Sequence, residues 1–335
     1  MKNILFFSSG RADLAFIYNL FRLFNKEKNF KTSIILNDPS KVDYNFISDD
    51  KIIRAKFQKF KTSKYNLIDY LGNLLKKYKT ILSKINPSYV IIVGDRYEAF
   101  AIAIVCNFLN IKIIHMAGGD VSKGAYDEEM RTYISKSAYL HFVTNLKSKI
   151  NLKNLLDDKK KIFNYGSPSL DYIKTIKNIS KKDISSKLKI NFNKYNILIT
   201  FHPETKNLKE TISNLNILLS TLNNLGNSYN FFITGSNNDT YGQIFNKTIK
   251  SFIKNKKNFY FFLNLGNINY VQLAKNCEMV LGNSSSQIYE IPFLGIRSLL
   301  IGSRQLGRCM SNRIIKTRIK NNELLNCIKK NINKK

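Results

Sequence analysis

Three aspartates follow apolar segments in the first half of the chain, at positions where carboxylates could exchange protons. Asp95 comes directly after the run YVIIVG, Asp120 follows IKIIHMAGG, and Asp127 opens the next helical pattern. In a parallel sheet, the loops after successive strands open on one edge, where ligands bind. Carboxylates gathered at such an edge can donate and accept protons, so we expect acid/base chemistry there.

Each aspartate also has a structural interpretation that the sequence leaves open. Asp95 could pair with the adjacent Arg96, and Asp120 could be a polar loop residue beside two glycines. Asp127 could lie in the first turn of a helix, where negative charge is favourable. The occurrence of all three on one predicted sheet edge favours a functional site.

A glycine and an arginine precede the first helical pattern, in SSGRADL at residues 8–14. We expect Gly10 to allow a sharp turn, and the helix N-terminus that follows to favour an anion. Arg11 could contact a diphosphate through two parallel hydrogen bonds, or could be a surface arginine. The stretch is neither a GxGxxG nor a P-loop motif, so by itself it is a weak signal.

A serine-rich turn occurs in the second half of the chain, in GNSSSQIYE at residues 282–290. Asn283, Ser284 and Ser285 follow the apolar run EMVLG, where N–H groups and hydroxyls could hold phosphate oxygens. Glu290 could accept both hydroxyls of a ribose. Serines that only cap a helix are the alternative, but the serines together with the glutamate favour a nucleotide site.

His202 and Arg304 complete the candidates in the second half. His202 lies in FHPET, after the apolar run NILIT, and its place at a sheet edge favours a functional role. Arg304 lies in GSRQLGR, after RSLLI, and could bind phosphate or cover the surface. His115 and His141 lie within apolar runs, and we expect both to be structural.

Short apolar runs alternate with helical patterns along the chain, which indicates parallel sheets covered on both faces. The fold class is therefore α/β, with two domains whose sheet edges should face each other across a cleft, and the family resemblance described below implies that both are Rossmann-like. The polar, lysine-rich segment 175–194 is the expected linker between domains at residues 1–175 and 176–335. The final helix could belong to the second domain or pack back on the first. A helix is also expected over residues 285–294.

The 54 basic and 23 acidic residues give a formal net charge of +31, which would attract nucleic acid or an anionic membrane. Lysines are, however, spread along the whole chain, and no nucleic-acid-binding motif stands out. No apolar run is long enough to span a membrane, and the N-terminus does not resemble a signal peptide. We therefore expect a cytoplasmic protein without nucleic-acid or membrane partners. The four cysteines show no paired spacing, and no metal site is predicted.

The order of these motifs resembles the hydrolysing UDP-N-acetylglucosamine 2-epimerases of sialic-acid- and legionaminic-acid-type biosynthesis. The resemblance spans nearly the whole chain, from SSGRADL through GDRYEAF, AGGDVSKGAYDEEMR and FHPET to GNSSSQIYE and GSRQLGR. It implies a glycosyltransferase-B-like architecture, a homodimer, a UDP-sugar substrate, and no metal or redox cofactor. The implied reaction removes the C2 proton of the sugar while UDP leaves C1, giving a 2-acetamidoglucal. Hydration then yields a free N-acetylmannosamine-type sugar from UDP-N-acetylglucosamine or a UDP-2,4-diacetamido-trideoxy analogue.

The resemblance also implies roles for individual residues. The acid/base carboxylates would be Asp95, Asp120 and Asp127, the diphosphate contacts Arg11, His202, Ser284 and Ser285, and the ribose contact Glu290. His202 counts among the catalytic candidates as well, because it could offset charge on the departing UDP. Further candidates are Gly10, Arg131, Asn283 and Arg304.

Three positions depart from the family pattern. A glutamate is common at the position of Asp120, an Arg-His pair at Arg131-Thr132, and the sequence GDRQ at residues 302–305, which read GSRQ here. Which carboxylate takes the C2 proton stays open, as do the substituents at C4 and C6 of the sugar. The alternatives are a non-hydrolysing 2-epimerase, a glycosyltransferase of the same architecture, and a UDP-sugar-binding protein without turnover.

Overall fold

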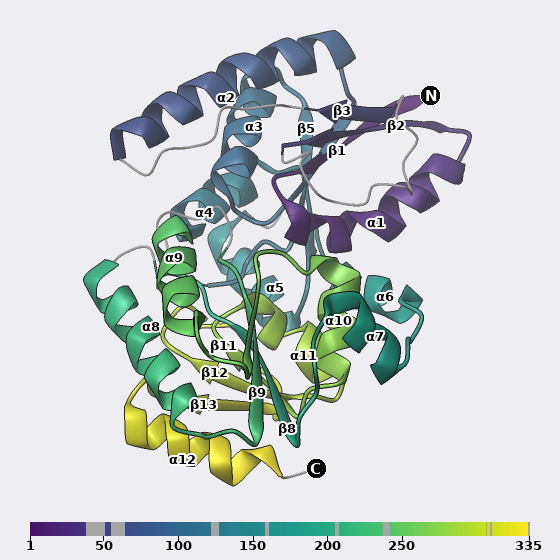
Figure 1. The fold of residues 1–335 in the computed structure, drawn as a ribbon. Coiled ribbons are helices and arrows are strands. Elements are labelled where there is room, and N and C mark those ends of the chain that lie inside the picture. The colour runs from purple at the N-terminus through teal and green to yellow at the C-terminus, as the bar shows by residue number, and fades with distance from the viewer. Residues whose placement is uncertain are drawn as a thin grey trace. The chain divides into compact units, whose positions relative to one another are not determined.

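The chain folds into two compact units, each built on one parallel sheet (Figure 1). The computed structural model describes residues 1–37, 51–54, 64–121, 127–157, 161–204, 208–236, 242–305, 307–308 and 310–333 of the 335. Unit 1 contains Met1–Val121 and Tyr126–Tyr172, and unit 2 contains Ile173–Lys335. The predicted α/β class with two parallel-sheet domains is thereby confirmed. Within the described residues, no helix combines the length and apolar character needed to span a membrane.

Unit 1 carries a parallel sheet in the order β3-β2-β1-β4-β5-β6-β7. Its strands are β1 (Lys2–Ser8), β2 (Phe30–Leu36), β3 (Ile52–Arg54), β4 (Tyr89–Val93), β5 (Lys112–Met116), β6 (Leu140–Val143) and β7 (Lys161–Asn164). The helices that begin in this part of the chain are α1 (Arg11–Lys26), α2 (Lys64–Ile85), α3 (Tyr97–Phe108), α4 (Asp127–Ser137), α5 (Leu146–Leu155) and α6 (Pro168–Thr175).

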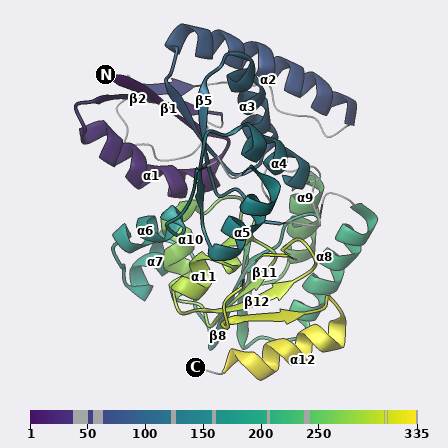
Figure 2. The same cartoon turned by 180° about the vertical axis from the view of Figure 1, so that it is seen from behind.

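Alternating side chains of β1 bury both faces of the sheet of unit 1. Leu5 and Phe7 belong to the core beneath α2 and α3, whereas Ile4 and Phe6 pack with α1. Figures 1 and 2 show α2 and α3 on one face and α1 on the other. Because successive strand residues point to opposite faces, a wholly apolar strand requires helices on both sides. The apolar run in the sequence therefore correctly indicated a doubly covered strand.

Unit 2 carries a parallel sheet in the order β10-β9-β8-β11-β12-β13. The strands are β8 (Tyr195–Thr200), β9 (Tyr229–Thr234), β10 (Phe259–Phe262), β11 (Met279–Gly282), β12 (Arg297–Ile301) and β13 (Ile314–Thr317). The helices are α7 (Lys181–Leu188), α8 (Leu208–Asn223), α9 (Gly242–Ile253), α10 (Gly266–Lys275), α11 (Glu290–Phe293) and α12 (Asn321–Ile332), with the 3₁₀ helix η2 (Ser285–Gln287).

The final helix packs within unit 2. Leu324, Ile328 and Ile332 of α12 are buried in the same core cluster as residues of α8 and α9. Leu198 of β8 points to the other face, where it packs with residues of α10 and α11. Of the two placements that the sequence left open for the last helix, the structure shows the one in the second unit.

The expectation of a linker at residues 175–194 is corrected, because this segment contains helix α7. Ser180 caps this helix by accepting a hydrogen bond from the Asp183 N–H at 3.1 Å. Ile184 is fully buried, and Ile190 joins the core of unit 2. The many lysines concealed a short amphipathic pattern, in which widely spaced isoleucines are enough to anchor a helix.

The helix expected over residues 285–294 is also corrected. The structure has η2 at Ser285–Gln287, followed by the separate short helix α11 at Glu290–Phe293. Pro292 has no N–H to donate to an earlier carbonyl, so it fits only in the first turn of a helix. Gly295, with φ of +77°, follows the end of α11.

Each sheet has one point at which the strand order reverses. In unit 1 it lies between β1 and β4, and in unit 2 between β8 and β11. The chain connections that leave the two strands at such a point lead toward opposite edges of the sheet. Ligands of open α/β sheets bind there, at the carboxyl ends of the two strands. Apart from Arg131, which lies in the second turn of α4, the candidate residues lie on loops, or at helix starts, that follow β1, β4, β5, β8, β11 or β12.

Candidate functional site

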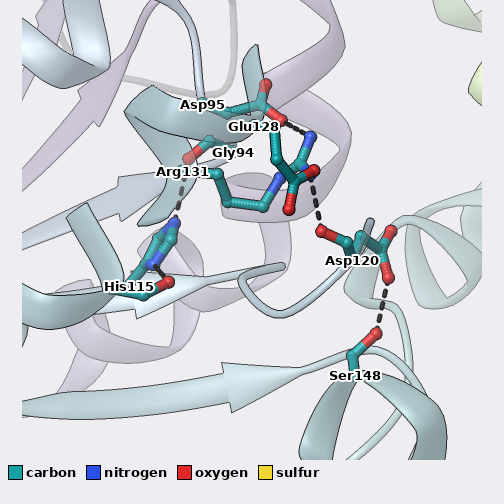
Figure 3. A network of polar contacts seen from close by, with 8 residues as sticks. Gly94, Asp95, His115, Asp120, Glu128, Arg131 and Ser148 are labelled. Carbon is teal, nitrogen blue, oxygen red and sulfur yellow. Dashed lines mark hydrogen bonds and ion pairs between the residues drawn. The ribbon is translucent and has the colours of Figure 1, made fainter. Parts of the chain in front are cut away.

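A buried arginine joins the loops after β4 and β5 in unit 1 (Figure 3). Arg131 on α4 is 2% exposed, and its guanidinium forms an ion pair with Asp95. It also donates to the backbone oxygen of Asp120 at 2.6 Å and to the Glu128 carboxylate at 2.9 Å. The planar guanidinium, with five donors, can serve these three acceptors at once. Arg131 therefore holds two of the predicted aspartates at one sheet edge.

The charge of Arg131 is secured by its surroundings. Burial works against the charged guanidinium, but Asp95, followed by Glu128 and Asp120, raises the pKa of Arg131 above its ordinary value. A buried cation needs such partners, because an unpaired charge would lose its hydration without compensation. Arg131, a further binding candidate from the sequence, is placed here as the organiser of the carboxylates.

Asp120 is fixed by the first turn of α5. Its Oδ1 accepts hydrogen bonds from the Ser148 hydroxyl at 2.5 Å and from the Asn145 side-chain amide at 3.3 Å. Asn145 is the N-cap of α5 and accepts from the Ser148 N–H at 2.9 Å. Asp120 is 7% exposed. Sequence reasoning did not identify α5 or these two partners, although an asparagine three residues before a serine is compatible with an N-cap.

Gly119 allows the Asp120 loop to approach α5. Its φ is +79°, and a Cβ at this position would lie 2.3 Å from the Ser148 carbonyl oxygen and 2.8 Å from Leu152 Cγ. Any other residue would clash with helix backbone and would also adopt a strained conformation. The glycine is therefore needed for the Asp120–Ser148 contact.

For the epimerase reaction that the sequence resemblance implies, replacing Ser148 with alanine should reduce kcat/KM about tenfold, because Asp120 loses a charge-assisted hydrogen bond. If UDP binds to the loops of unit 2, as the sequence predicts, its affinity should stay within about twofold, since the Asp120–Ser148 contact lies wholly in unit 1. Steady-state kinetics and UDP titration measure both quantities. Ile150→Ala, an exposed change on the same helix, is the control. Equal kinetics for the two variants would show that Ser148 does not support Asp120.

His115 is a buried structural residue, as expected from its apolar run. Its Nδ1 lies 3.1 Å from the Ser135 hydroxyl and its Nε2 lies 2.9 Å from the Gly94 carbonyl oxygen. Burial lowers the pKa of His115 to about 4, although the Gly94 bond and Asp95 oppose this shift. The neutral ring thus holds the backbone immediately before Asp95. His141 is also fully buried and contacts His115 edge-on, with ring centroids 6.4 Å apart.

The depressed pKa of His115 predicts a loss of stability in mild acid. The unfolded chain binds a proton near pH 6.5, whereas the folded chain resists it down to about pH 4, so stability falls as pH decreases through this window. Between pH 7 and 5 the contribution lost is about 2 kcal/mol. Asp13 has the opposite effect on stability. Burial raises its pKa to about 6, so the folded chain binds this proton before the unfolded chain does and gains stability as the pH falls. Urea unfolding at both pH values should therefore compare the wild type with His115→Asn, which lacks the His115 component. An identical pH dependence in both proteins would contradict this account.

The turn after β1 is organised by Asp13, which sequence reasoning missed. Its Oδ2 accepts from the Ser9 N–H at 2.7 Å, the Ser9 hydroxyl at 2.5 Å and the Gly10 N–H at 3.2 Å. Gly10 has φ of −175°, an extended conformation open to any residue, so the expected sharp turn at Gly10 is wrong. A Cβ there would instead lie 2.8 Å from Nη1 of Arg96, which shows that Arg96 extends to this turn.

Two predicted residues begin helices of unit 1. Arg11 and Asp127 are the first residues of α1 and α4, respectively. Their side chains lie outside the described parts of the structure, so their roles remain predictions. Among the described residues, no group of three or more His, Cys, Asp and Glu side chains is arranged to hold a metal ion.

Asn283 fixes the backbone around His202 in unit 2. Its Oδ1 accepts from the His202 N–H at 2.7 Å, and its Nδ2 donates to the His202 carbonyl at 2.9 Å. The Asn283 carbonyl accepts from Gln305 Nε2 at 2.8 Å. The Asn283 side chain is fully buried and its amide is used in these bonds. These bonds join the loops after β8, β11 and β12, and the role of Asn283 as a substrate contact stays a prediction.

The serine turn after β11 is preorganised by its own hydroxyls. The Ser284 hydroxyl caps η2 and accepts from the Ser286 N–H at 3.3 Å and from the Ser286 hydroxyl at 3.1 Å. Ser286 also lies 2.8 Å from the Tyr270 hydroxyl. Ser285 is exposed, while Glu290 is half-buried at the start of α11. Capping therefore explains part of the serine signal, and Ser285 is the hydroxyl most open to a ligand.

The chain resembles known proteins over most of its length. A protein-family model described as UDP-N-acetylglucosamine 2-epimerase matches residues 25–335. The chain is 32% identical over 326 residues to the GDP/UDP-N,N'-diacetylbacillosamine 2-epimerase (hydrolyzing) of Campylobacter jejuni subsp. jejuni serotype O:2, covering 95% of this chain and 85% of that protein. It is 25% identical over 335 residues to the polysialic acid biosynthesis protein P7 of Escherichia coli, covering 97% and 85%, respectively.

A solved structure shows the same fold. The UDP-GlcNAc 2-epimerase from Neisseria meningitidis bound to UDP-GlcNAc superposes with a TM-score of 0.81 at 16% identity, covering 98% of this chain and 91% of that one. At this identity the likeness is evidence for the fold alone, and it confirms the predicted fold class.

Proposed function

This chain belongs to the UDP-N-acetylglucosamine 2-epimerase family, and on that premise we propose that it is a hydrolysing 2-epimerase, which releases UDP and a free 2-acetamido sugar. The observation that carries the proposal is the buried Arg131, which holds Asp95 and Asp120 together at the edge of one sheet. A transferase or a simple binding protein would not need such a carboxylate set. The printed name of the 32% identical relative, which specifies hydrolysis, supports the same choice.

The proposed chemistry uses the carboxylates in two steps. A carboxylate takes the C2 proton, the C–H electron pair forms a C1–C2 double bond, and the C1–oxygen bond breaks so that UDP departs. Water then adds its hydroxyl to C1, and C2 receives a proton on the opposite face. In this proposal Asp95 takes the C2 proton, and its ion pair with Arg131 holds the carboxylate in position. Asp120 is fixed by two donors, which suits it to hold an oriented water or substrate hydroxyl.

The nucleotide would bind to the loops of unit 2. In this proposal His202, Ser284, Ser285 and Arg304 contact the diphosphate, Glu290 contacts the ribose, and Arg11 adds a cation. The support for the residues of unit 2 is their location after β8, β11 and β12, next to the point where the strand order reverses, whereas Arg11 follows β1 in unit 1. N–H groups and cations there would offset the negative charge that develops on the departing UDP. A homodimer and a cytoplasmic location belong to the proposal on the family resemblance alone.

We propose a UDP-2,4-diacetamido-trideoxy sugar as the preferred substrate, because the relative at 32% identity is named for diacetylbacillosamine. Purified protein should be incubated in parallel with this nucleotide sugar and with UDP-N-acetylglucosamine, and both the nucleotide and the sugar products should be quantified. We expect UDP and free sugar in equal amounts, with higher kcat/KM for the diacetamido substrate. A UDP-linked epimer as the final product would replace the proposal with a non-hydrolysing epimerase. Absence of any product from both substrates would refute an epimerase function.

A further inference from the structure

A glutamate in the loop after β8 holds the loop after β12. Glu204 Oε1 accepts from the Ser303 N–H at 2.8 Å and from the Arg304 N–H at 3.3 Å. Its Oε2 accepts from the Ser303 hydroxyl at 2.6 Å. One half-buried carboxylate therefore receives three hydrogen bonds from two consecutive residues. Sequence reasoning treated His202 as the functional residue of FHPET and did not consider Glu204.

The backbone around Glu204 is itself fixed from the other side. The Thr211 hydroxyl on α8 lies 3.2 Å from the Glu204 nitrogen and donates to the Glu204 carbonyl at 3.0 Å. Thr211 is 3% exposed. The Glu204 carboxylate thus extends from a loop that is fixed to α8. Through it, the position of residues 303 and 304 depends on α8.

Gly302 allows this close approach. Its φ is +77°, and a Cβ at this position would lie 2.5 Å from Glu204 Oε1. The loop after β12 is therefore shaped around the carboxylate. The neighbouring Gln305 donates to the Asn283 carbonyl at 2.8 Å, so the same loop is joined separately to the loop after β11.

Position 303 carries a hydroxyl, and this hydroxyl donates to the Glu204 carboxylate. An aspartate at 303 would place a second negative charge about 3 Å from the first, and the two would repel strongly. The two positions can therefore carry one ionised carboxylate between them, but not two.

We propose that Glu204 is a positioning residue that holds the backbone of residues 303 and 304, and that it thereby orients Arg304 toward the UDP diphosphate. This inference rests on the proposed function, since UDP is taken as the ligand. Because Glu204 acts through the backbone of residues 303 and 304, its loss should weaken nucleotide binding more than it slows the chemical steps.

The test compares Glu204→Gln, Ser303→Asp and the double variant with the wild type. Glu323→Gln, an exposed change on α12 that forms no part of the loop, serves as the control. Amide hydrogen exchange of a peptide covering residues 302–305 measures how firmly the loop is held. UDP titration and steady-state kinetics measure its effect on the ligand, and thermal unfolding confirms that each variant is folded.

We expect Glu204→Gln to accelerate exchange in residues 302–305, to weaken UDP binding about tenfold, and to raise KM more than it lowers kcat. Ser303→Asp should be at least equally impaired because two carboxylates then face each other. The double variant should recover to within about threefold of wild-type affinity, so the two changes should be strongly non-additive. This rescue is a result that a general loss of structure would not produce.

Two distinct failures would have different meanings. If the wild type binds UDP but Glu204→Gln changes neither exchange nor affinity, or if the two substitutions add independently, the role assigned to Glu204 is wrong and the proposed function stands. If the wild type neither binds UDP nor releases it from a UDP-sugar, the proposed function is refuted, and the assigned role in diphosphate binding is refuted with it.

Discussion

Replacing Arg131 with methionine should lower the free energy of unfolding by about 3 to 5 kcal/mol and remove measurable turnover. The guanidinium is the shared partner of Asp95, Glu128 and the Asp120 carbonyl, and it is almost fully buried. Its removal leaves the buried Asp120 carbonyl and the largely buried Asp95 carboxylate without their donor. Denaturant unfolding followed by circular dichroism measures the loss. Lys136→Met, an exposed change on the same helix, should cost less than about 0.5 kcal/mol.

A double-mutant cycle separates the Arg131–Asp95 pair from general packing. Because each single change leaves the other group without its main partner, the combined Arg131→Met and Asp95→Asn variant should be less damaged than the sum of the two. Arg131→Lys should rescue only partly, because an ammonium group lacks the planar arrangement of donors. Additive effects, or full rescue by lysine, would show that Arg131 does not organise the site as proposed.

Asp95→Asn should reduce turnover by about a thousandfold or more while leaving UDP affinity within about threefold. The amide matches the carboxylate in shape but cannot take a proton, and the proposed UDP-binding loops lie in unit 2. Single-turnover measurements with saturating UDP-sugar, together with UDP titration, distinguish chemistry from binding. Because the variant keeps Arg131 paired with Glu128, it should remain folded.

The comparison for this prediction is Glu129→Gln, an exposed carboxylate in the same helical turn as Glu128. Its turnover should stay close to that of the wild type. Retained turnover in Asp95→Asn would remove Asp95 from the chemistry, and sugar transfer to an acceptor by this variant would favour a glycosyltransferase instead.

The strands were predictable because burial on both faces leaves a local trace in the sequence. Runs such as YVIIV at β4 are apolar at every position, and this pattern needs no knowledge of distant residues. The short edge strands β3 and β13 lack such a run and were not anticipated. Helix α7 was concealed by lysines that cover its exposed side.

The candidate site was predictable in its location but not in its connections. Asp95 and Asp120 follow neighbouring parallel strands, so their proximity could be inferred from topology. The partner of Asp95, by contrast, is 36 residues away on α4, and Glu204 holds residues about 100 positions later. Such contacts depend on the tertiary fold, and a single sequence carries no local signal of them. Asn283 shows the same limit, because its bonds to His202, 81 residues earlier, carry no local signal either.

The central claim is that carboxylates in unit 1 exchange the C2 proton and that the nucleotide leaves as UDP. Proton and phosphorus nuclear magnetic resonance of the reaction in D₂O tests both parts in one sample. We predict a free sugar of inverted C2 configuration, with one deuterium at C2, formed in step with UDP as the only nucleotide product. Free sugar that retains its C2 proton, or a UDP-linked epimer that accumulates without release of UDP, would contradict the account.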